Sequence, residues 1–149
     1  MYAFADGVVS RTERNSLLCL IPFYDILPLH EAVNYYKTAI SGEVNFYNSD
    51  KNYSPDKKLF PFLEADGGDW YWVDLNTGTE NYNKIYWTTT LAQEPDYLFN
   101  SLNSMFKTID ECYEKNIIFL NEEGILSCDY LAWGQVAEKN NQGLDYWKS

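Results

Sequence analysis

The sequence is short of the residues that most nucleophilic and metal sites require. Among its 149 residues there is one histidine, His30, and there are three cysteines, none of them in a Cys-x-x-Cys pair. An odd cysteine count without such spacing argues against a disulfide scaffold and against a zinc site. A His-assisted nucleophile would have to use His30, and no nucleophile motif accompanies it. We therefore expect an exposed or capping His30, no enzyme, no metal and no cofactor.

Positive charge is also scarce. There are 11 Lys and Arg residues against 22 Asp and Glu residues, a formal net charge of −11. Nucleic acids and anionic membrane surfaces attract positively charged proteins, so neither is an expected partner. Complementary charge favours a basic protein as the partner. The alternative, that acidity only keeps a cytosolic protein soluble, stays open.

Long apolar runs and a leader sequence are missing as well. The longest apolar stretch, residues 17–24, is interrupted by Pro22 and is too short to span a bilayer. The N-terminus lacks the positive region and apolar core of a signal peptide. We therefore expect a soluble, cytoplasmic protein. Its length and its 46% of apolar residues suit one domain over residues 1–149 with a proper core.

Aromatic residues, in contrast, are abundant, at 17% of the chain, and the most informative stretch runs from Phe60 to Leu75. Two apolar, aromatic runs flank the turn Asp66-Gly67-Gly68-Asp69, which predicts a β-hairpin. Pro61 cannot donate a ladder hydrogen bond, so its strand is predicted to be an edge or to have a free N–H side. Alternation places Trp70, Trp72 and Asp74 on one face of the second strand, and Tyr71, Val73 and Leu75 on the other.

The remaining elements follow from local spacing. Pro28 suits the first turn of a helix that Ser41-Gly42 ends. Pro95 and Asp96 are predicted to open a second helix, whose apolar stripe runs from Leu98 to Tyr113 and which ends near Asn116. Because strands and helices do not alternate in a βαβ rhythm, we expect an α+β domain with a mainly antiparallel β-sheet and helices packed against it. We also expect strands at 16–21 and 85–90, a surface loop at 48–58, a short strand or extended segment at 117–120, a turn at 123–124 and a last helix at 129–139.

The hairpin carboxylates do not form a recognisable catalytic or cation site. Asp66, Asp69 and Asp74 could in principle act as paired carboxylates, but Asp beside Gly is also what turn geometry requires. They do not match a calcium loop, which needs more oxygen ligands at fixed spacing. Gly67-Gly68 is not a phosphate loop, because no Lys-Ser/Thr follows and because it lies between strands.

Several segments together resemble the SUKH superfamily, which includes bacterial immunity proteins and fungal cell-wall assembly regulators. Each motif is weak alone, but their order is fairly specific. The chain departs from the family pattern in starting inside the first motif, without the usual N-terminal helix, and in having Gln142 where the family often has Pro. The matching segments are, in order, residues 1–7 (MYAFADG), 21–32 (IPFYDILPLHEA), 60–62 (FPF), 66–71 (DGGDWY) with Asp74, the strand at 85–87, the helix at 95–113, and 140–147 (NNQGLDYW).

The resemblance implies a bacterial immunity protein that binds and neutralises a toxin domain of nuclease or deaminase type. In this interpretation an acidic, aromatic surface covers the basic active-site cleft of the toxin. The alternative is a regulatory or scaffold module that binds other proteins, like the fungal members. The expected partner-binding residues are Glu64, Asp66, Asp69, Trp70, Trp72, Asp74 and Glu80, although Trp72 could equally belong to the core.

Overall fold

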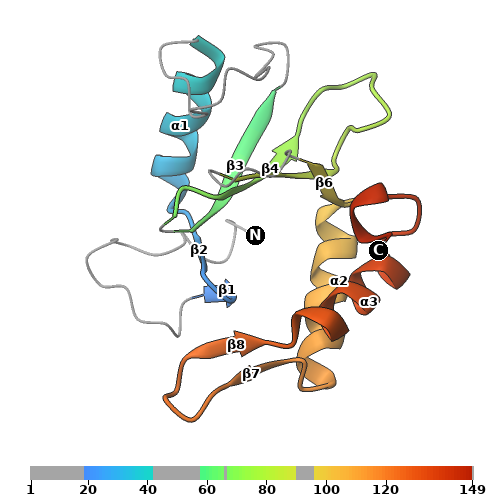
Figure 1. Cartoon of the computed structure of the whole chain (residues 1–149). Helices are drawn as coiled ribbons and strands as arrows, with labels where there is room; N and C mark the ends of the chain where they lie inside the picture. The colour runs from blue at the N-terminus through green and yellow to red at the C-terminus, as the bar shows by residue number, and fades with distance from the viewer. Residues whose placement is uncertain (1–18, 42–57, 66, 90–95, 149) are drawn as a thin grey trace.

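The fold is built on one sheet of six antiparallel strands, with helices on both of its faces (Figure 1). The computed structural model describes residues 19–41, 58–65, 67–89 and 96–148. Within these ranges, the strands of the sheet lie side by side in chain order. The α+β fold with a mainly antiparallel sheet, which the sequence predicts, is thereby confirmed. The six strands are β1 (Cys19–Ile21), β2 (Tyr24–Ile26), β3 (Leu59–Ala65), β4 (Trp70–Asp74), β5 (Ile85–Thr88) and β6 (Asp96–Phe99).

The predicted hairpin forms the middle of the sheet. β3 and β4 pair antiparallel, with Leu59 opposite Asp74 and Glu64 opposite Trp70. At the turn, the Ala65 N–H donates to the Asp69 carbonyl and the Gly68 N–H donates to the Ala65 carbonyl. Gly68 has a φ of 84°, which glycine adopts without strain. The glycine pair therefore serves the turn.

Pro61 does not mark an edge strand, because β3 pairs with β2 on one side and β4 on the other. β2 contacts only residues 63–65 of β3, so Pro61 lies beyond the reach of the β2 ladder. The register with β4 also shifts between Pro61 and Leu63, which marks a bulge or irregularity. Of the two predictions for this strand, the edge position is wrong and the free N–H side holds, since no neighbouring strand requires a hydrogen bond from Pro61.

One helix covers the first face of the sheet. α1 (Leu29–Ser41) begins directly after Pro28, as predicted. Its residue Ala32 belongs to a buried cluster with Leu27, Leu59, Trp70 and Trp72. We call this side the α1 face. It contains the Trp70 and Trp72 side of β4, as the alternation predicts.

The C-terminal part of the chain covers the opposite side, which we call the α2–α3 face. It consists of α2 (Leu102–Glu114), a hairpin of β7 (Ile118–Leu120) and β8 (Leu126–Cys128), α3 (Tyr130–Asn140) and the 3-10 helix η3 (Asp145–Trp147). In the larger core cluster, side chains of α2 and α3 such as Met105 and Trp133 join Tyr71, Trp87 and Leu98 from the sheet. Figure 1 shows α2 and α3 lying next to each other.

The predicted start of the second helix is wrong. Residues 96–99 form the edge strand β6, which pairs with β5, and α2 begins only at Leu102. The start is fixed by a capping box, in which the Ser101 side chain accepts from the Ser104 N–H and the Ser104 side chain accepts from the Ser101 N–H. Leu98 is buried all the same, but it contributes to the core from a strand.

Other predictions hold in part. The described end of the 16–21 strand is β1, and the 85–90 strand is β5. α3 begins at Tyr130 after the N-cap Asp129, close to the predicted 129–139. Of the predicted 48–58 loop, only Lys58 is within the described residues. The three-residue strands β2 and β8 had no prediction.

Candidate functional site

Three of the predicted partner-binding residues lie in the interior. Trp70 is 6% exposed, Trp72 is fully buried and Asp74 is 2% exposed. Trp70 packs edge-on against Tyr35 of α1, with ring centroids 4.9 Å apart. Trp70 and Asp74 are therefore not presented at the surface, and for Trp72 the core alternative holds, because α1 and the neighbouring strands cover this side of the hairpin.

Of the other four predicted residues, the structure describes Glu64, Asp69 and Glu80. Glu64 and Asp69 are half-buried near the turn of the hairpin, and Glu80 is exposed in the loop between β4 and β5. Asp66 lies outside the described residues. That these acids contact a partner stays a prediction, but Asp69 also lies next to a different feature of the molecule.

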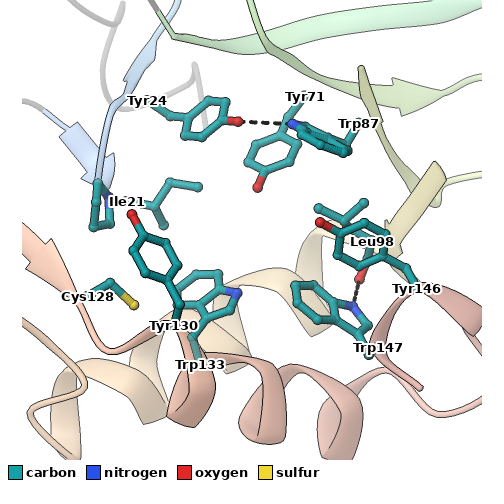
Figure 2. Close-up of a pocket in the computed structure, with 11 residues that line it drawn as sticks. Ile21, Tyr24, Tyr71, Trp87, Leu98, Cys128, Tyr130, Trp133, Tyr146 and Trp147 are labelled. Atoms are coloured by element: carbon teal, nitrogen blue, oxygen red, sulfur yellow. Dashed lines mark hydrogen bonds between the residues drawn. The ribbon is translucent and has the colours of Figure 1, made fainter. Parts of the chain in front are cut away.

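That feature is a pocket on the α2–α3 face, with a volume of about 310 Å³. Figure 2 shows its residues arriving from the sheet on one side and from the C-terminal part of the chain on the other. Pockets that bind ligands are mostly apolar with a few convergent polar groups, and this one has that character. Its lining consists of Ile21, Pro22, Tyr24, Tyr71, Trp87, Leu98, Cys128, Tyr130, Trp133, Tyr146 and Trp147.

Aromatic contacts hold the walls of the pocket. Tyr24 stacks on Tyr71, with ring centroids 4.6 Å apart and an interplanar angle of 18°. The Trp87 indole N–H donates to the Tyr24 hydroxyl at 3.0 Å. On the other side, Tyr146 meets both Trp87 and Trp147 edge-on, and the Trp147 indole N–H donates to the Leu98 carbonyl. β2, β4, β5, β6 and η3 thus fix the positions of these rings.

Two polar groups inside the pocket have no partner within the described part of the chain. Tyr71 and Trp133 are 6% and 8% exposed, yet neither the Tyr71 hydroxyl nor the Trp133 indole N–H makes a hydrogen bond there. Neither atom is sealed off either, because the only fully enclosed unpaired side-chain atom in these residues is Asn140 Oδ1. Figure 2 shows the Tyr71 hydroxyl pointing into the space between Tyr130 and Tyr146.

Carboxylates lie close enough to the pocket to act on the groups that line it. Burial raises the pKa of Tyr24 to about 12, and the nearby Asp69 carboxylate adds to this rise. Burial likewise raises the pKa of Tyr146, with a further contribution from Asp96. Negative charge near these tyrosines favours a positive charge over a negative one at this place.

Exposed apolar side chains occur in the lining and directly next to lining residues in sequence. Phe23 is 67% exposed at the turn between β1 and β2, directly between the lining residues Pro22 and Tyr24. Its φ of 72° is unusual for a bulky residue. Tyr130 and Leu131, in the first turn of α3, are 64% and 84% exposed. Exposed rings of this kind are typical of protein interfaces.

His30 and Cys128, which have catalytic potential, lie on different faces of the sheet. His30 is exposed in the first turn of α1, as predicted. Cys128 lines the pocket, but burial and then Asp129 raise the pKa of its thiol to about 11, so the thiol is protonated at neutral pH. No three His, Cys, Asp or Glu side chains within the described residues lie close enough together to hold a metal ion.

Sequence reasoning missed the pocket, although one signal pointed toward it. Alternation along β4 places Tyr71 opposite in direction to Trp70 and Trp72, and it is Tyr71 that faces the pocket. Tyr24, Tyr130 and Tyr146 belong to segments whose contacts are made over long sequence distances. No local pattern reveals that these segments meet.

Comparison with known proteins identifies the family. The helices in the described ranges are too short or too polar to traverse a lipid bilayer. Searches of curated proteins and of solved structures found no match. A family model, described as SMI1 / KNR4 family (SUKH-1), matches residues 10–111. The match takes in the pocket residues of the sheet and ends before those of β8, α3 and η3. Since it covers more than half of the sequence, the chain belongs to the SMI1/KNR4 (SUKH-1) family, within the superfamily that its motifs resemble.

Proposed function

We propose that this chain is a bacterial immunity protein, which binds a toxin domain and blocks it. The α2–α3 face is the proposed docking surface. The observation that carries this proposal is the aromatic pocket, which the exposed Tyr130 lines and to whose lining residues the exposed Phe23 and Leu131 are direct neighbours in sequence. Family membership supports a role in protein binding.

The physical character of this face suits a basic toxin domain of nuclease or deaminase type. Large, rigid aromatic side chains supply most of the binding energy in protein interfaces. A net charge of −11 speeds the approach of a positively charged partner. In this proposal the protein acts by occupying the cleft of the toxin and transforms no substrate itself.

The test is binding to the toxin domain encoded beside this gene, measured by co-purification and by calorimetry. Phe23→Ala and Tyr130→Ala should each weaken binding by about 30-fold, the loss typical of a central interface aromatic. Affinity should also fall as salt rises from 0.05 to about 0.5 M, because salt screens charge attraction.

Tyr82→Ala is the matched control. Tyr82 is 45% exposed in the loop between β4 and β5, and it does not line the pocket. The variant should bind like the wild type. Equal losses in all three variants would move the interface away from the α2–α3 face. If the neighbouring toxin domain does not bind and a cellular protein of another class does, the regulatory or scaffold role replaces the immunity role.

A further inference from the structure

The pocket lies within the proposed docking face, and its size limits what can enter it. Its volume of about 310 Å³ lies at the lower end of the range of ligand pockets, about 300–1,000 Å³. A single large side chain suits that volume better than a cofactor does. We propose that the pocket receives the side chain of one arginine of the partner protein. This inference rests on the proposed function and names the group that the docking face recognises.

The aromatic lining favours a guanidinium group. Arginine stacks on aromatic faces, and its charge is attracted to the electron-rich face of Trp and Tyr. The pocket contains rings from both sides, including the stacked pair Tyr24 and Tyr71 and the indoles of Trp87 and Trp133. An arginine side chain entering between them would also cover its apolar stem.

The unpaired polar groups of the pocket add a second, independent argument. The Tyr71 hydroxyl lies in a 6% exposed side chain, is without a hydrogen-bond partner in the described residues, and points into the cavity (Figure 2). A guanidinium group carries five N–H donors, and a tyrosine oxygen can accept from one of them. The Trp133 N–H can then donate to a carbonyl oxygen of the partner's backbone or to water.

Charge decides between arginine and a neutral side chain of similar size. Asp69, the residue before β4, and Asp96, the first residue of β6, contribute electrostatically at tyrosines of the pocket. Asp129, at the N-cap of α3, acts on Cys128. None of the three lines the cavity, but each adjoins an element that does: Asp69 precedes β4, Asp96 begins β6 and Asp129 caps α3. A phenyl or leucyl side chain would fill the space but would gain nothing from these carboxylates.

The five tryptophans of the chain make a direct test possible. Trp87, Trp133 and Trp147 line the pocket, whereas Trp70 and Trp72 lie on the α1 face. Each gives one indole N–H signal in an NMR spectrum of ¹⁵N-labelled protein. The probes are the capped tripeptide Gly-Arg-Gly and the same peptide with citrulline, which has the shape of arginine and no charge.

The arginine peptide should shift the signals of Trp87, Trp133 and Trp147 in a saturable way, and those of Trp70 and Trp72 should stay in place. The citrulline peptide should bind at least tenfold more weakly. Tyr71→Phe and Asp69→Asn should each weaken arginine binding several-fold. The matched controls Tyr82→Phe and Glu80→Gln, both in the loop between β4 and β5, should leave it unchanged.

Equal binding of the two peptides, shifts confined to Trp70 and Trp72, or no shift at millimolar peptide would each overturn the arginine pocket. The citrulline comparison uses only the wild-type protein, so the test does not depend on whether a variant folds. If the arginine peptide fails but the toxin domain still binds, the proposed function stands without this pocket. If the peptide binds and no toxin does, the pocket stands and the immunity role fails.

Discussion

Both faces of the sheet carry Trp and Tyr side chains, but the two faces differ in the hydrogen bonds that polar atoms of these side chains form. On the α1 face, the buried polar groups are paired: the Trp72 indole N–H donates to Thr88 Oγ1 at 2.8 Å, and the Tyr97 hydroxyl donates to Asp74 Oδ2 at 2.6 Å. On the α2–α3 face, Tyr71 and Trp133 are buried to a similar degree but lack partners in the described residues. The first arrangement stabilises the fold. The second leaves one hydroxyl and one indole N–H that can form hydrogen bonds with a ligand.

This difference helps to distinguish aromatic residues of the core from aromatic residues of an interface. Composition cannot tell a core tryptophan from an interface tryptophan, because both are large and apolar. Hydrogen-bond pairing separates them, since a buried polar group without a partner costs free energy that only a ligand or water recovers. Trp70, Trp72 and Asp74, which were expected to bind a partner, lie on the α1 face, whereas the pocket on the other face holds the Tyr71 and Trp133 groups, unpaired in the described residues, beside the paired indoles of Trp87 and Trp147.

The largest effect is expected for Trp72→Ala on the α1 face. Trp72 is fully buried, stacks against Trp70 with ring centroids 5.5 Å apart, and donates to Thr88. Its truncation should lower the free energy of unfolding by about 3–5 kcal/mol, as measured by urea denaturation. Tyr130→Ala, at a 64% exposed position, should change it by only about 0.5 kcal/mol. Similar losses in the two variants would remove the distinction between the faces.

A sharper comparison removes one hydroxyl from each face. Tyr97→Phe leaves the buried carboxylate of Asp74 without one of its donors, which should cost about 1–3 kcal/mol. Tyr71→Phe removes a hydroxyl that has no partner in the described residues, so its cost should stay within about 0.5 kcal/mol. Both variants keep the ring, and thermal or urea unfolding measures both.

The order of these two variants is what matters. If Tyr71→Phe proves the more destabilising, its hydroxyl has a structural partner, and the case for an unfilled pocket is lost. If the order holds, binding experiments with Tyr71→Phe report on the pocket and not on folding.

The sheet was largely predictable, because its signals are local. The glycine turn and the aromatic runs of residues 60–75 define the central hairpin, and the alternation along β4 correctly separates Trp70 and Trp72 from Tyr71. What alternation cannot say is that helices cover both faces of the sheet. The assignment of Trp70, Trp72 and Asp74 to a binding surface failed at that point.

The errors at residues 96–99 and at the pocket have a common origin in long-range contacts. In sequence, Leu98 continues the apolar helical stripe of Leu102 and Met105. In the structure, its segment pairs with β5 as a strand, and the helix begins only after the N-cap Ser101. The pocket likewise requires β2 and η3 to meet across more than a hundred residues of chain. Periodicity describes one segment at a time and cannot anticipate such a meeting.

The smallest effect is expected for the charged hydrogen bonds of Glu111, which join α2 to α3. Glu111 of α2 accepts from Lys115 at 2.6 Å, from Lys139 of α3 at 2.7 Å and from Asn140 of α3 at 3.0 Å. These hydrogen bonds, first those from Lys115 and Lys139, lower the pKa of Glu111 to about 2 from an ordinary value of 4.5. Both lysines are mostly exposed, so solvent and salt weaken the interaction.

Because the folded-state pKa lies below the unfolded one, the stabilisation by Glu111 is complete above about pH 4.5 and is lost as the pH falls toward 2. Glu111→Gln should therefore unfold slightly more easily than the wild type at pH 7, and the difference should vanish near pH 2 and shrink in 1 M salt. Glu114→Gln, on the same helix but without an ion pair in the described residues, should match the wild type throughout. A difference for Glu111→Gln that persists at pH 2 would show that packing, and not charge, joins α3 to α2. The α2–α3 face would then be held together in the same way as the α1 face.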